Sequence, residues 1–191
     1  MRPSRLLALG LLLVPFNFYL GRFDLLPNPL GWLLAVLARR QMGARHQLLT
    51  AAMWSSVFGL VLSLVTTLAS WTGPQAGLGP LPMIEGLLPV LVVVLVCSAL
   101  IALAGTHDPS TTKQANVIRP IAPVFALVTI VLAGTSVNSS GLTVIDETVG
   151  PAIALLIFAV GGLAVHVWFL ILLMTHGQTL DTEPARSDSV D

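Results

Sequence analysis

Long apolar runs without a charged side chain constrain this chain more than any other feature of its sequence. Leu87–Ala104 and Pro151–Val165 contain no Asp, Glu, Lys or Arg, and runs of about 18 residues or more are typical of helices that cross a bilayer. Charged residues make up only 9% of the chain, whereas a water-soluble domain carries about a quarter. The sequence therefore predicts an all-α fold, a polytopic transmembrane helical bundle.

Clusters of Gly, Pro, Ser and Asn divide the apolar sequence into about six segments. The predicted spans are Leu6–Leu20, Leu25–Ala38, Leu48–Trp71, Leu87–Gly105, Ile121–Val137 and Pro151–Met174. Residues 1–175 then form a single transmembrane domain. Residues 176–191 are polar and lack an apolar period, so they are predicted to be a disordered cytoplasmic tail.

The first two predicted spans are shorter than the roughly 20 residues that a crossing helix needs. They are also interrupted by Pro15, Asn17, Pro27 and Pro29. One interpretation is two short or tilted crossings. The other is a re-entrant hairpin packed against four true spans. The sequence favours six full crossings, and either arrangement returns the chain to the side from which it started.

The distribution of Lys and Arg predicts the orientation. If the N-terminus is cytoplasmic, eight of the nine Lys and Arg residues fall on the cytoplasmic side, and Arg22 is the exception. This distribution is the one that the positive-inside rule describes. The expected location is therefore the inner cell membrane, with both termini in the cytoplasm. The chain also lacks a small-residue cleavage site after its first apolar stretch, so that stretch is predicted to be a retained span.

Small and hydroxyl residues recur at helical spacing in three of the spans, which is the pattern of helix-packing faces in membranes. This pattern predicts that the third, fifth and sixth spans pack together in a compact bundle. The alternative is that the Ser/Thr stripe of the third span lines an aqueous path. The packing residues are Ser56, Gly59, Ser63, Thr66 and Ser70, then Ala126, Thr129 and Ala133, then Gly162.

His166 is the ionisable residue that lies well inside a predicted span. Such residues are costly in lipid and often mark a proton or substrate path. A neutral imidazole that donates one hydrogen bond to a neighbouring helix explains it as well. This structural role is favoured because none of the predicted spans supplies an acidic partner for His166 inside the membrane.

Arg22 and Asp24 flank the start of the second predicted span. Asp24 is placed to cap that helix by accepting hydrogen bonds from its first amides, and Pro27 suits a first helical turn. The functional alternative is a binding site built on a broken helix, as in transporters. Capping is favoured because no second copy of the pattern follows in the sequence.

The segment Phe23-Asp-Leu-Leu-Pro-Asn-Pro-Leu-Gly-Trp-Leu-Leu, followed by Arg39-Arg40, resembles the start of uncharacterised small multi-pass membrane proteins of bacteria, actinobacteria in particular. The resemblance covers about the first 45 residues. Asn28 stands where such proteins often have an acidic residue. The resemblance implies a bacterial inner-membrane protein and supplies no activity.

Three functions remain open. The leading hypothesis is a non-enzymatic accessory, regulatory or self-associating membrane protein. The second is a small transporter or channel that uses His166 and the Ser/Thr stripe. The third is a membrane-embedded enzyme acting on lipid, with Arg22, Asp24, Asp146 and Glu147 as its polar candidates. The sequence carries no catalytic motif, and we expect no cofactor, no metal and no nucleic-acid partner.

Overall fold

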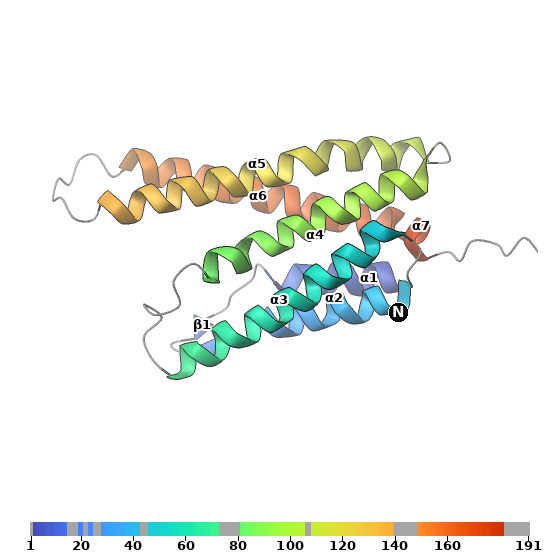
Figure 1. Ribbon diagram of the computed structural model, residues 1–191. Helices are drawn as coiled ribbons and strands as arrows, with labels where there is room; N and C mark the ends of the chain where they lie inside the picture. Colours follow the sequence, from blue (N-terminus) through green and yellow to red (C-terminus); the bar gives the residue numbers. More distant parts are fainter. Residues whose placement is uncertain are drawn as a thin grey trace, which may run out of the picture.

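The computed structural model describes residues 2–14, 19–20, 23–24, 28–42, 46–72, 81–105, 108–139 and 149–181 (Figure 1). The helices in this part of the chain are α1 (Pro3–Leu13), α2 (Asn28–Met42), α3 (Gln47–Thr72), α4 (Leu81–Ala104), α5 (Pro109–Ser139), α6 (Val149–His176) and α7 (Gln178–Asp181). A minimal antiparallel strand pair joins β1 (Tyr19–Leu20) to β2 (Phe23–Asp24). The predicted helical bundle is confirmed.

Helices α3, α4, α5 and α6 are long and apolar enough to cross a membrane. The helices therefore indicate an integral membrane protein. Helices α1 and α2 have 11 and 15 residues. At about 1.5 Å per residue, both are shorter than a hydrocarbon core about 30 Å thick. The short lengths of α1 and α2 therefore match the alternative with four crossing helices, in which α1 and α2 form a short helical pair.

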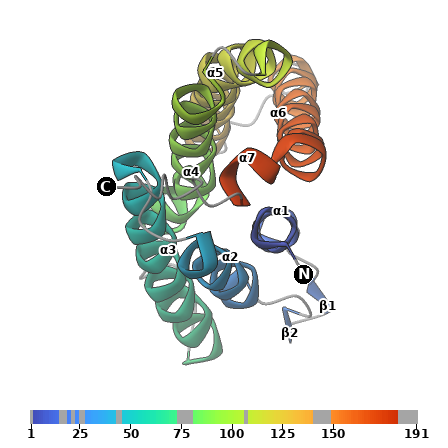
Figure 2. The ribbon, with the colours of Figure 1, turned by 90° about the vertical axis from the view of Figure 1, so that its right-hand side faces the viewer.

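The helices are arranged so that each packs on its neighbour in the sequence, and α6 returns to α1 (Figure 2). The predicted bundle of the third, fifth and sixth spans is wrong in this respect. Helix α3 packs between α2 and α4, whereas α5 packs between α4 and α6. Short connections favour such neighbour pairing, and small-residue faces do not specify which helix they meet.

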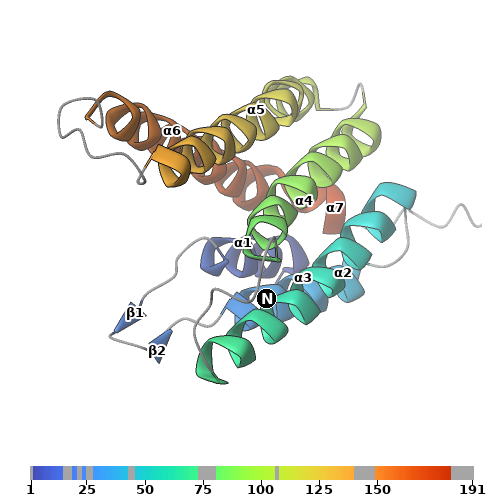
Figure 3. The same cartoon turned by 60° about the vertical axis from the view of Figure 1, so that its left-hand side comes forward.

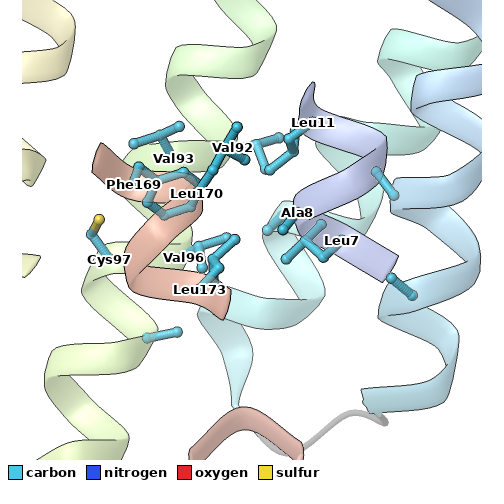
Figure 4. Close-up of a cluster of buried hydrophobic side chains, with 14 of the residues drawn as sticks. Leu7, Ala8, Leu11, Val92, Val93, Val96, Cys97, Phe169, Leu170 and Leu173 are labelled. Carbon is cyan, nitrogen blue, oxygen red and sulfur yellow. The ribbon is translucent and has the colours of Figure 1, made fainter. Parts of the chain in front are cut away.

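The core lies where α1, α4 and α6 converge (Figure 4). Leu7 and Leu11 of α1 meet Val92 and Val96 of α4 and Phe169 of α6, and all five side chains are fully buried. Cys97 lies in the same cluster as a free, buried thiol. In lipid, this close packing supplies the attraction that the hydrophobic effect supplies in water.

Two glycines allow α1 and α2 to pack with their backbones almost in contact. A Cβ atom on Gly10 would lie 2.7 Å from the carbonyl oxygen of Gly31, and a Cβ on Gly31 would lie 2.8 Å from the carbonyl oxygen of Gly10. No residue larger than glycine fits at either position without moving a helix. This pair therefore fixes the distance between the two short helices.

Both ends of the described chain meet at one end of the bundle, which we call the terminal end; the opposite end is the distal end. The backbone amide and hydroxyl of Ser4 both donate to the carboxylate of Asp181 in α7, over 3.0 and 2.7 Å. The prediction that disorder begins at residue 176 is wrong for residues 176–181, because α7 packs on α1 and α4. Residues 182–191 lie outside the described part.

Helix α5 begins twelve residues before the predicted start of its span, and Asp108 explains why. Its carboxylate accepts a hydrogen bond from the Thr111 amide at 3.1 Å, and Pro109 occupies the first helical position, where its missing N–H costs nothing. The hydrogen bonds from Thr111 lower the pKa of Asp108, and the nearby His176 lowers it further. The sequence Asp108-Pro109 is therefore a helix cap rather than a free turn.

Candidate functional site

The structure gives His166 a backbone partner. Its Nε2 atom lies 2.9 Å from the carbonyl oxygen of Leu11, near the end of α1. The residue four positions after Leu11 is Pro15, which has no N–H to donate in the helical pattern. The carbonyl can only accept, so the Nε2 atom carries the proton. His166 thus caps α1 from α6, as the structural interpretation predicted.

We expect His166→Leu to lower the free energy of unfolding by about 1–3 kcal/mol, because it leaves a carbonyl without a donor in an apolar setting. His166→Gln keeps an N–H donor and should recover most of that loss. Unfolding of the purified protein in rising SDS, followed by circular dichroism, measures both. Equal stability of the Leu and Gln variants would contradict the capping role.

The predicted packing face of α3 is buried against α2. Ser56 and Ser63 are fully buried, and the Ser56 hydroxyl donates to its own helix at the Ala52 carbonyl. A Cβ atom on Gly59 would lie 2.7 Å from the indole of Trp32 in α2. The side chain of Ser70 lies outside the described residues. The stripe therefore packs helices along most of its length.

The predicted faces of α5 and α6 are covered less completely. Ala126 and Thr129 are half-buried, and the Thr129 hydroxyl donates to the Phe125 carbonyl of its own helix. Gly162 is also half-buried, and a Cβ atom there would meet only Phe125, at 3.7 Å. The side chain of Ala133 is not among those described. The described members of these two faces are therefore only partly covered by their neighbours.

The remaining polar candidates from the sequence are Arg22, Asp24, Asp146 and Glu147. The backbone of Asp24 lies in β2, but its side chain, Arg22, Asp146 and Glu147 fall outside the described part of the chain. Both the capping role of Asp24 and the lipid-enzyme candidates therefore stay predictions.

The structure adds a polar cluster that the sequence analysis missed, at the distal end between α2, α3 and α4. Glu85 in the second turn of α4 accepts a hydrogen bond from Asn28 Nδ2 at 3.2 Å and one from Thr66 Oγ1 at 2.8 Å. The predicted fourth span began at Leu87, so Glu85 fell in a connection. A signal was available, because Thr66 lies on the small-residue stripe and Glu85 stands two residues before the uncharged run Leu87–Ala104.

Arg39, which the positive-inside rule assigns to the cytoplasmic side, is buried within the protein, with 2% of its surface exposed. Its Nη1 atom lies 4.0 Å from the Met42 sulfur. Nothing in the sequence distinguishes it from its neighbour Arg40, which is exposed. Position 39 lies on the same helical face as Asn28 and Trp32, and this register turns it inward.

Among the described residues, no group of three or more His, Cys, Asp and Glu side chains is arranged to hold a metal ion. The comparisons with known proteins add no relative: the chain matches no family model, no curated protein and no solved structure.

Proposed function

We propose that this protein is a non-enzymatic membrane protein that works by assembly, receiving a membrane-embedded helix against the distal halves of α5 and α6. It acts as an accessory or regulatory subunit, or assembles with its own copies. The observation that carries this proposal is that the rest of the protein covers the distal halves of α5 and α6 only incompletely. Of the described side chains in 121–131 and 153–168, none is buried, whereas buried side chains occur in both helices nearer the terminal end, Ala115 and Ile118 in α5 and Phe169 and Leu173 in α6 among them.

The short length of α1 causes this incomplete cover. Helix α1 ends near the level of His166, whose bond to Leu11 marks the last contact described above between the two helices. Helix α6 continues beyond that level for more than half of its 28 residues. Figure 3 shows α5 and α6 running away from α1, α2 and α3 in this direction.

The face that α6 turns to α1 continues past His166 as small residues. Gly162 and Ala159 lie on the same side of the helix, and Ala159 is exposed. Small residues in membrane helices allow close approach of a second helix, because packing and not hydrophobicity drives the association there. Lipid alone would be served equally well by large apolar side chains, such as the exposed Ile157 on the opposite side of the helix.

The membrane in question is, in this proposal, the inner membrane of a bacterium. The excess of Lys and Arg at the terminal end supports a cytoplasmic location for both termini. The transporter alternative loses support because His166 is held by a backbone carbonyl. The lipid-enzyme alternative rests on residues outside the described part.

A photo-crosslinking amino acid at Ala159, followed by mass spectrometry of the products from native membranes, tests the proposal. A product with one recurring protein supports an accessory subunit, and a product with the chain itself supports self-association. Products with lipid alone would contradict the proposal.

Gly162→Leu is expected to reduce recovery of the crosslinked partner at least about tenfold, because the larger side chain occupies the space of the incoming helix. The chain itself should fold, since a Cβ at this position makes one ordinary contact. Gly86→Leu is the matched control, because a Cβ there meets nothing within 4 Å. Equal recovery from both variants would remove Gly162 from the interface.

A further inference from the structure

A row of polar side chains lies on the exposed side of α5, in the half of the helix nearer the terminal end. Lys113, Asn116 and Arg119 are spaced three residues apart, so consecutive members are neighbours on the helix surface. All three side chains are exposed, whereas the intervening Ala115 and Ile118 are buried. The row therefore faces away from the rest of the protein.

The register between α5 and α6 places this row at the depth of apolar residues. The indole N–H of Trp168 donates to Gln114 Oε1 at 3.3 Å, so Gln114 lies level with Trp168. Between that level and the end of α6 at the terminal end, Phe169–Met174 is wholly apolar. Arg119 lies five residues beyond Gln114, about 8 Å further from the terminal end. An exposed charge at such a depth is costly unless a partner meets it.

Neither cation of the row has a carboxylate partner within the described part of the chain. The ion pair among those residues joins His176 to Asp108. Side chains on a helix lean toward its N-terminus, and the N-terminus of α5 lies at the terminal end. Lys113 and Arg119 therefore reach back toward the membrane surface at that end, where one anionic group can meet both of them.

The same side of α5 is apolar beyond the row. Val124, Leu127 and Val131 are exposed, and helical spacing places them on the side of α5 that carries Lys113. From Arg119 to Val131 this stripe extends about 18 Å, which is close to one leaflet of a hydrocarbon core about 30 Å thick. A cationic row followed by an apolar stripe of this length matches a phospholipid, with its charged headgroup first and its acyl chains after.

We propose that Lys113, Asn116 and Arg119 bind the headgroup of an anionic phospholipid whose acyl chains lie along α5. The phosphate oxygens accept hydrogen bonds from the ammonium, amide and guanidinium groups, and the planar guanidinium can donate two in parallel. In the orientation proposed above, this lipid belongs to the cytoplasmic leaflet, whose anionic lipids attract basic segments. The site is independent of the proposed assembly face, which is centred on Ala159 and Gly162 of α6.

Native mass spectrometry of the purified full-length protein in detergent tests the proposal, with dioleoyl phosphatidylglycerol and dioleoyl phosphatidylcholine added in turn. The two lipids share their acyl chains and differ in the charge of the headgroup. We expect the protein to retain phosphatidylglycerol in preference to phosphatidylcholine, and inorganic phosphate at equal concentration should not displace it. Equal retention of the two lipids, or displacement by inorganic phosphate, would overturn the proposal.

The double variant Lys113→Gln, Arg119→Gln should weaken the affinity for phosphatidylglycerol about tenfold or more, because both charges that hold the headgroup are removed. Both side chains are exposed, so this variant should fold. The matched control is Arg5→Gln, Arg40→Gln, which removes two exposed charges from α1 and α2 and should bind phosphatidylglycerol as the natural protein does. An equal loss in both double variants would show that net charge alone retains the lipid, which would also overturn the proposal.

Discussion

Gly10→Leu is expected to lower the free energy of unfolding by about 3 kcal/mol or more, and to leave little folded protein. A Cβ atom at Gly10 would lie 2.7 Å from the Gly31 carbonyl oxygen and 2.8 Å from the Ala35 backbone nitrogen. Both are backbone atoms, so no rotation of a side chain relieves the overlap. Helices α1 and α2 must move apart, which disrupts the core that Leu7 and Leu11 form with α4 and α6.

SDS-induced unfolding followed by circular dichroism measures this loss, with Gly86→Leu as the control. The control gains the same helix propensity, but a Cβ at Gly86 meets nothing within 4 Å. Its stability should stay within about 0.5 kcal/mol of the natural protein, as for other exposed positions. If the two variants are equally stable, the close contact of α1 with α2 does not hold the fold together.

The second large effect is expected for Gly59→Leu in the middle of α3. The Cβ atom would lie within 2.8 Å of three carbon atoms of the Trp32 ring, and Trp32 is among the largest fully buried side chains. Overpacking of this kind typically costs about 1–3 kcal/mol, and more where neighbours cannot yield. The sequence predicted that this glycine lies on a face that packs the third span with the fifth and sixth; the structure places its contact on Trp32 of α2 instead.

A double-mutant cycle with Gly59→Ala and Trp32→Leu isolates this contact. Trp32→Leu alone should destabilise the protein, because it leaves space between α2 and α3. With the indole removed, Gly59→Ala should cost less than it does in the natural protein, which gives a favourable coupling of about 1 kcal/mol. Additive effects in the same unfolding assay would show that the two residues do not press on each other.

The sequence by itself determined the class of the protein and the approximate position of each helix. Apolar runs are a local property, and a backbone in lipid must satisfy its hydrogen bonds within the segment. This is why the predicted span Leu48–Trp71 agrees closely with α3. The boundaries failed where capping decided them, as at Asp108, and where a polar side chain lies inside a helix, as at Glu85.

Only the tertiary structure decided which helices are neighbours and what each polar side chain contacts. A stripe of small residues predicts close packing but not the partner, so α3 was expected against α5 and α6 and instead packs on α2 and α4. The roles of His166 and Glu85 depend on residues far away in the sequence, Leu11 and Asn28 among them. In a membrane such pairs form by shape and hydrogen bonding between distant faces, and no local periodicity encodes that match.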